Sequence, residues 1–219
     1  ADGARPDALF YIFHLLGEWR EKSAYRPLAR LLRRPPDEID AIFGDGIVET
    51  AHRVMVAVFD GDPRPIRGIV LDPEADQFVR SRMCEALAML AISGRLARDD
   101  AARFLHGCFS DLKPESDNFV WHGWQSAIAM LGAAELTPLV KQAFERGSVD
   151  PQWLGFADFE QDLARARAHP DKPWPENDGE FTLWGDTVAE LSTWYGFSEQ
   201  CKQDQERLRR SAEERAILD

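Results

Sequence analysis

Cysteine is scarce in this sequence of 219 residues, which contains only three. Cys84, Cys108 and Cys201 are far apart and form no C-x-x-C pair, so they indicate neither a disulfide framework nor a cysteine-based metal site. The five histidines are scattered as well, and none lies in H-E-x-x-H or another metal-ligand spacing. The sequence therefore predicts no metal site and no cofactor, and its few cysteines suit a reducing cytoplasm.

Long apolar runs are missing too. No stretch approaches the roughly 20 apolar residues that a membrane span requires. The start of the chain, "ADGARPDALF", lacks the basic region, the apolar run and the cleavage site of a signal peptide. We therefore expect a cytoplasmic protein that makes no use of a membrane. Because the sequence begins without methionine, the natural chain is expected to extend upstream.

Basic residues are fewer than acidic residues in this sequence. The chain has 26 Lys and Arg against 38 Asp and Glu, which gives a net charge of −12. Most of the imbalance falls in residues 111–219, with 11 basic and 21 acidic side chains, whereas residues 1–110 have 15 and 17. An acidic chain repels a phosphate backbone, so the charge argues against a nucleic-acid partner.

Helical periodicity is what the sequence does contain. Apolar residues recur at helical spacing almost throughout, and no segment alternates like a strand. Shorter second helices start near Pro27, Pro65 and Pro138, where a proline costs little because the first-turn N–H groups have no intrahelical partner. The pairs of helices repeat with a period of roughly 37 residues, which is typical of an α-solenoid. We predict an all-α fold, a HEAT-like superhelix of antiparallel helix pairs; an irregular helical domain is the alternative.

Three parts are predicted along the chain. Residues 1–168 form the HEAT-like helical repeat array, residues 169–179 a Pro-rich connection, and residues 180–219 a C-terminal helical segment. The last helix of the array is expected to begin at Asp150 and Pro151, an N-cap followed by a proline.

Few residues suggest chemistry. No G-x-S-x-G, P-loop or G-x-G-x-x-G motif is present. Asp45 and Glu49 are four residues apart, so they could act as paired carboxylates near His52, although a helix start with Asp45 as N-cap explains them better. Trp121 and Trp124 could line an aromatic pocket, but core packing is the preferred interpretation.

Several phrases carry a resemblance to one family. They are "LLGEWREKSAYRPLARLLR", "FGDGIVET", "FDGDPRPIRGIVLDPEADQFVRSRMCEALAML", "ERGSVDPQWLGFADFEQDL" and "DTVAELSTWYGFSE". In these the chain resembles the bacterial family called domain of unknown function 1186. The resemblance implies a HEAT-like helical solenoid with no assigned activity. Some relatives end in a Cys-rich zinc-binding motif, but only Cys201 lies in that region here, so no zinc site is expected.

The leading hypothesis for function is a non-enzymatic scaffold that binds a protein partner. The alternatives are a helical-repeat enzyme or accessory lyase-type protein with an acidic pocket, and a nucleic-acid-binding solenoid. Second helices of solenoids often face the concave surface, and here they are rich in arginine. We therefore predict a positive groove that binds an acidic peptide or protein segment. Its residues would be Arg26, Arg30, Arg33, Arg64, Arg67 and Arg103.

Overall fold

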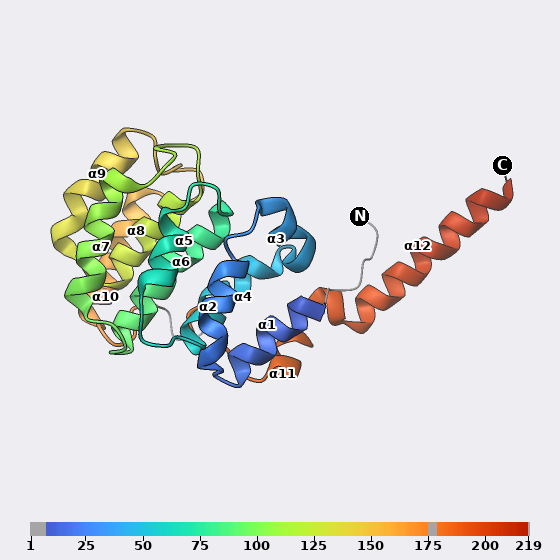
Figure 1. Cartoon of the computed structure of the whole chain (residues 1–219). Helices are drawn as coiled ribbons and strands as arrows, with labels where there is room; N and C mark the ends of the chain where they lie inside the picture. Colours follow the sequence, from blue (N-terminus) through green and yellow to red (C-terminus); the bar gives the residue numbers. More distant parts are fainter. Residues whose placement is uncertain (1–7, 175–178, 219) are drawn as a thin grey trace.

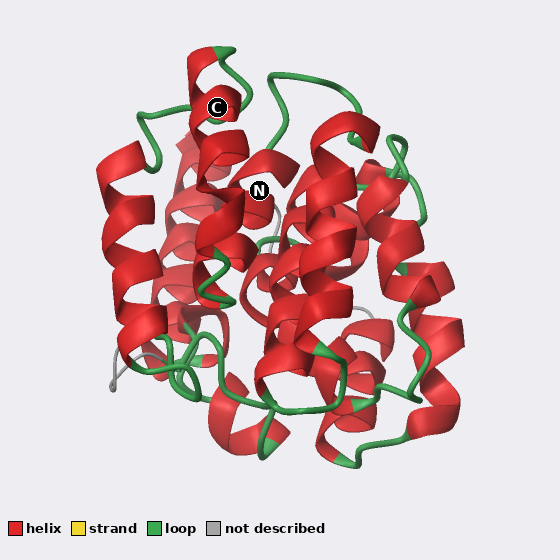
Figure 2. Ribbon diagram, turned by 90° about the vertical axis from the view of Figure 1, so that its left-hand side faces the viewer, coloured by secondary structure: helices red, strands yellow, loops and turns green. Residues whose placement is uncertain are grey.

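The computed structural model describes residues 8–174 and 179–218, and every regular element in these residues is helical (Figure 2). The prediction of an all-α fold is thus confirmed. The α-helices are α1 (Ala8–Glu18), α2 (Tyr25–Leu31), α3 (Pro36–Phe43), α4 (Gly46–Ala57), α5 (Arg64–Leu71), α6 (Gln77–Ile92), α7 (Arg98–Asp111), α8 (Val120–Met130), α9 (Thr137–Glu145), α10 (Phe156–Ala168), α11 (Thr187–Leu191) and α12 (Glu199–Leu218). Short 3₁₀ turns cover Lys22–Ala24, Ala134–Leu136 and Tyr195–Phe197.

The shorter helices that were predicted to start near three prolines are present. Pro27, Pro65 and Pro138 lie in the first turns of α2, α5 and α9. An N–H group in a first turn has no intrahelical acceptor, so a proline there costs no hydrogen bond. The longer helix α6 begins with a side-chain cap instead, since Asp76 accepts hydrogen bonds from the N–H groups of Phe78 and Val79, both at 2.9 Å. Local sequence thus sets where these helices begin.

Five helices pack side by side in chain order and form what we call the first-helix layer: α1, α4, α6, α8 and α10 (Figure 1). The shorter helices α5 and α7 pack against α6, while α2 contacts α5 and α9 contacts α7. Helix α6 lies at the centre and is buried over nearly all of residues 79–91. Each helix of the layer therefore packs against its neighbours in the layer, and α6 also packs against α5 and α7, the helices before and after it in the chain.

The closest approach within this layer joins α6 to α8. A Cβ atom on Gly123 would lie 2.2 Å from the backbone oxygen of Ser81, which no real contact permits. Glycine in α8 and a small serine in α6 therefore let the two backbones meet. On the far side of α8, Trp121 and Trp124 are fully buried, and their indole N–H groups donate to the carbonyl oxygens of Pro114 and Leu105. The preferred core interpretation of both tryptophans is correct.

Beyond α10 the chain runs back to α1 and α4, the first two helices of the first-helix layer. Residues 179–194, which we call the return segment, contact α1 and α4, and α11 lies beside α1 (Figure 1). The indole of Trp184 is fully buried, 4.7 Å from the ring of His14 between ring centroids, and its N–H donates to the Thr187 hydroxyl. Helix α12 then projects away from the body (Figure 1). Among the described residues, no helix has the length and apolar character needed to cross a bilayer.

Candidate functional site

One face of the first-helix layer combines polar and aromatic residues. Phe78, Arg82 and Glu85 are spaced by four and three residues along α6, and His122 and Ser126 are four apart on α8. Residues at these spacings share one side of a helix. Two cavities open on this face, one near the N-terminal ends of the helices and one beneath the chain that follows α10.

The first cavity, which we call the aromatic pocket, has a volume of about 610 Å³. It lies where α6 and α8 begin, and the loop between α9 and α10 forms its outer wall. Its lining is mainly apolar and consists of Val48, Gln77, Phe78, Asp117, Asn118, Phe119, His122, Gly147, Ser148, Val149, Asp150, Pro151 and Trp153.

Phe119 lies at the centre of the aromatic side chains of this pocket. Its ring centroid is 4.8 Å from that of Phe78, and the ring of His122 stacks on it at 4.7 Å. Trp153 meets it edge to face at 6.1 Å. Trp153 is 73% exposed and Phe78 is 37% exposed, so the cluster presents large apolar surface to solvent. Partial burial lowers the pKa of His122 and favours its neutral, apolar form.

The polar rim of the aromatic pocket is built from Gln77, at the start of α6, and from loop residues. The side chains of Gln77 and Asn118 accept hydrogen bonds from the first N–H groups of the α8 region, at 2.8 and 3.1 Å. Asp150 accepts from the N–H of Gln152 at 2.9 Å and closes a turn. The prediction that a helix begins at Asp150 is wrong, because this turn delays α10 until Phe156. The delay is what brings Trp153 to the wall of the pocket.

The other end of this face already holds a non-helical piece of the chain itself, which begins with a turn at residues 179–182. The ring Nε2 of His52 donates to the carbonyl oxygen of Glu180 at 2.6 Å. The guanidinium of Arg53 donates to the carbonyl oxygens of Thr182 and Leu183, at 2.9 and 3.4 Å. It also forms an ion pair with Glu190 at 2.6 Å. Side chains of α4 thus bind backbone groups of the return segment, as they would bind a peptide.

The paired-carboxylate hypothesis is weakened by this arrangement. Asp45 and Glu49 are both exposed, and Asp45 precedes α4 without a side-chain capping bond. His52 is fully buried under the return segment, so its ring does not share a solvent-filled pocket with them. Glu49 instead lines an open depression of about 770 Å³ together with Glu190. Among the described residues, no group of three or more His, Cys, Asp and Glu side chains is arranged to hold a metal ion.

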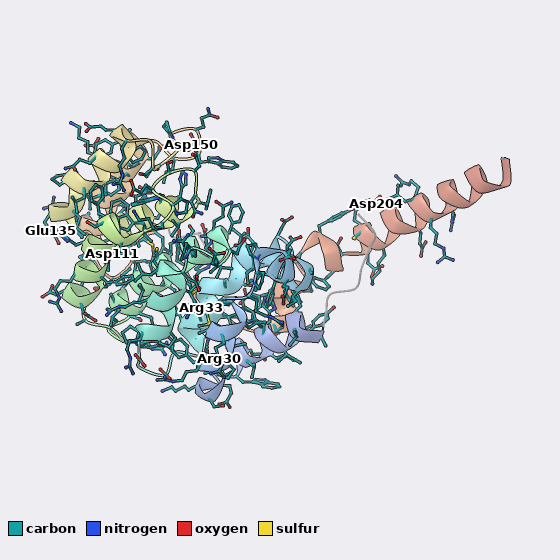
Figure 3. All side chains as sticks on the ribbon, turned by 45° about the horizontal axis from the view of Figure 1, so that its top comes forward. Arg30, Arg33, Asp111, Glu135, Asp150 and Asp204 are labelled. Carbon is teal, nitrogen blue, oxygen red and sulfur yellow. The ribbon has the colours of Figure 1, made fainter. Side chains whose placement is uncertain are left out.

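The arginines predicted to bind a partner mostly face carboxylates of the same chain. Arg26 contacts Asp60 and Asp62, and Arg64 also contacts Asp62. In the same way Arg33 pairs with Asp72, whereas Arg67 and Arg103 pair with Asp100. Arg30 is exposed and has no ion pair among the described residues. Figure 3 places Arg30 and Arg33 near the middle of the body and Asp111, Glu135 and Asp150 at the end away from α12. Binding of an acidic partner by these arginines stays a prediction.

These ion pairs lead to a testable difference between two arginines. Arg67 donates to Asp100 at 2.6 Å and packs over the ring of Phe104, and its side chain is only 22% exposed. Replacing it with glutamate would place two carboxylates together and is expected to lower the free energy of unfolding by about 2 kcal/mol. The same change at exposed Arg30 is expected to stay within about 0.5 kcal/mol. Urea unfolding of both variants measures the difference, and equal effects would contradict the pairing.

Buried histidines predict how stability depends on pH. Burial lowers the pKa of His14 to about 4, and it lowers the pKa of His52 well below 6.5. Below pH 6.5 the unfolded chain therefore binds protons that the folded chain does not, and stability falls as the pH drops towards 4. His14 alone is expected to contribute a loss of about 2 kcal/mol between pH 7 and pH 5.

The measurement is urea unfolding of the parent protein and of His14→Gln at pH 7 and pH 5. The variant lacks the imidazole that donates to the Phe10 carbonyl and contacts the Thr50 hydroxyl, so it should be less stable at pH 7. Its disadvantage should shrink by about 2 kcal/mol at pH 5. A disadvantage that is independent of pH would show that His14 is not held neutral in the folded protein.

Comparison of this sequence with known proteins identifies the family to which the chain belongs. The model of the family described as a protein of unknown function (DUF1186) matches residues 7–198. An uncharacterized protein of Chlamydia trachomatis serovar D is 24% identical over 184 residues, which is 84% of this chain and 72% of that protein. An uncharacterized protein of Chlamydia muridarum is also 24% identical, over 84% of this chain and 73% of its own. No solved structure matches significantly. Since the family model spans the first-helix layer, the aromatic pocket and the return segment, this chain belongs to the DUF1186 family.

Proposed function

We propose that this protein is a non-enzymatic binding module that holds an extended segment of a protein partner in the aromatic pocket. The observation that carries the proposal is the exposed aromatic cluster around Phe119, with Trp153 and Phe78 open to solvent above a pocket of about 610 Å³. Exposed aromatic side chains at a rimmed pocket are typical of protein interaction sites. Trp153 would be the main contributor to the binding energy.

The return segment supports the proposal. On the same side of the helix layer, His52 and Arg53 bind backbone carbonyl groups of residues 180–183. A face that recognises a non-helical stretch of its own chain by these contacts has the chemistry to recognise another one. The aromatic pocket is where such a stretch could continue without displacing the return segment, because no return-segment residue lines it.

Charge selects the kind of partner. Asp117 and Asp150 lie on the rim of the aromatic pocket, and the chain carries a net charge of −12. An aromatic or aliphatic side chain would fill the pocket, and a neighbouring lysine or arginine would face the two carboxylates. A basic partner at the aromatic pocket is a different proposal from an acidic partner at the predicted arginine groove. In that groove, five of the six arginines already have a carboxylate partner within the chain.

A HEAT-like solenoid is part of the same proposal. The Arg26–Asp60, Arg26–Asp62, Arg33–Asp72 and Arg67–Asp100 contacts join residues 34, 36, 39 and 33 positions apart. These separations are close to the repeat of about 37 residues expected for stacked helix pairs. Each unit would then contact mainly the next one along the chain. The cytoplasmic location also belongs to the proposal, and the buried thiols of Cys84 and Cys108 are compatible with it.

The experiment is selection from a random peptide display library on the immobilised full chain. We expect peptides with an aromatic or aliphatic residue next to lysine or arginine. Trp153→Ala should weaken the selected peptide by about tenfold or more, as loss of a central tryptophan does at other interfaces. The control is Trp19→Ala, because Trp19 is 65% exposed directly after α1 and does not line the pocket.

Two results would overturn the proposal. One is a peptide whose affinity is the same for the parent protein, Trp153→Ala and Trp19→Ala. The other is selection of acidic peptides whose binding is lost in Arg30→Glu and kept in Trp153→Ala, which would favour the arginine groove instead.

A further inference from the structure

A second cavity on the same face of the helix layer is smaller and more enclosed. It lies between α6, α8, α10 and the chain that follows α10, with a volume of about 370 Å³. That volume is at the small end of the range of pockets that hold small molecules. Its lining shares no residue with the aromatic pocket and consists of Glu85, Ser126, Met130, Leu154, Asp162, Arg165, Pro173, Trp174, Glu180 and Phe181.

Glu85 is the unusual residue in this lining. It is a charged residue in the middle of the apolar run of α6, and its side chain is only 8% exposed. One carboxylate oxygen, Oε2, accepts a hydrogen bond from Arg82 at 2.7 Å. The other, Oε1, has no hydrogen bond among the described residues. This oxygen is not fully enclosed by protein atoms, so a donor in the adjacent cavity can reach it.

The charges that face this cavity are mainly negative. Glu85, Asp162 and Glu180 line it, whereas Arg165 is the one cation in its described lining and is paired with Asp162 at 2.6 Å. Arg82 bonds Glu85 and Glu180 but does not line the cavity. Burial raises the pKa of Glu85, and its contact with Arg82 acts in the opposite direction. A cation in the cavity would add to the effect of Arg82 and favour the charged carboxylate.

Aromatic side chains complete the wall. The rings of Trp174 and Phe181 both line the cavity, with centroids 5.7 Å apart and planes inclined at 40°. Ring faces attract organic cations, and the attraction strengthens where water is excluded. Carboxylates on one side and aromatic rings on the other are the groups that recognise an ammonium or guanidinium ion on an aliphatic chain.

We infer that this cavity binds a small organic cation, a primary amine or guanidine on a short aliphatic body. The cationic head contacts the free oxygen of Glu85 and the carboxylate of Asp162. The aliphatic part packs against Trp174, Phe181 and Met130, which line the same cavity. This site is separate from the aromatic pocket, so either one can fail without the other.

Isothermal titration of the full chain with putrescine and agmatine tests the inference, with 1,4-butanediol and glutarate as uncharged and anionic probes of similar length. We expect one molecule of amine or guanidine to bind per chain, and neither other probe to bind. Glu85→Gln should weaken binding by about tenfold or more, because it removes a buried charge that the ligand pairs with. Glu49→Gln, a change at an exposed carboxylate outside the cavity, should leave the affinity within about twofold.

Circular dichroism shows whether Glu85→Gln folds. A second variant keeps the inference testable if it does not. Asp162 is half exposed, so Asp162→Asn is expected to fold and should weaken binding by several-fold. Absence of binding by both cations at millimolar concentration would overturn the inference. So would a cation that binds the folded Glu85→Gln and Asp162→Asn variants as tightly as the parent, because it would have to occupy another site.

Discussion

Replacing Gly123 with alanine is expected to lower the free energy of unfolding by about 3 kcal/mol or more. The added methyl group would lie 2.2 Å from the backbone oxygen of Ser81 and 2.5 Å from its carbonyl carbon. Backbone atoms cannot move aside as a flexible side chain can, so α6 and α8 would have to separate. Because α6 is the buried centre of the first-helix layer, the loss of packing would extend to both of its neighbours.

The control for this prediction is Gly107→Ala. Gly107 is also in the interior of a helix, α7, but the nearest atom to its added methyl would be a carboxylate oxygen of Asp111 at 3.8 Å. Alanine is the better helix former, so this variant should be unchanged or more stable by up to about 1 kcal/mol. Urea unfolding compares the two variants. Similar stability for both would mean that α6 and α8 are not in close contact.

Truncation of Trp184 to alanine is the second large effect, with an expected cost of about 3–5 kcal/mol. The indole is fully buried, packs beside His14 and Gly17, and has the guanidinium of Arg53 4.9 Å from its ring centroid. Its loss would leave a large cavity between α1, α4 and the return segment. The return segment should then detach before the rest of the protein unfolds.

Two measurements test this expectation. Urea unfolding should show the loss of stability, and limited proteolysis under native conditions should show new cleavage within residues 179–194. Trp153→Ala is the matched control, because Trp153 is largely exposed and its removal should cost less than about 1 kcal/mol. A Trp184→Ala variant as stable and as protease-resistant as Trp153→Ala would contradict the described position of the return segment.

Local signals in the sequence predict most of the helices. Pro27, Pro65 and Pro138 mark the second helices because the physical reason, a first turn without N–H partners, involves only neighbouring residues. Asp150 illustrates the limit of such reasoning. The Asp-Pro pair suits a helix start as well as a turn, and the choice of the turn depends on packing of the loop that bears Trp153.

The binding of the return segment to α4 could not be predicted because it joins distant parts of the chain. His52 and Glu180 are 128 positions apart, and no periodicity relates them. The arginines are a different case. Their carboxylate partners lie about one repeat further along the chain, so the period itself could have indicated that Arg67 would meet Asp100. Phe78, Arg82 and Glu85 gave a weaker signal, a stripe of aromatic and charged residues on an otherwise apolar helix.

The most direct test of the proposed function is hydrogen exchange of the full chain with and without a display-selected peptide. We predict slower exchange at the starts of α6 and α8 and in the α9–α10 loop, residues 77–82, 118–123 and 147–153. Residues 26–34 and 64–67, which contain the predicted arginine groove, should exchange as in the free protein. Protection of the arginine-containing helices, with the residues around Phe119 and Trp153 unchanged, would contradict the account.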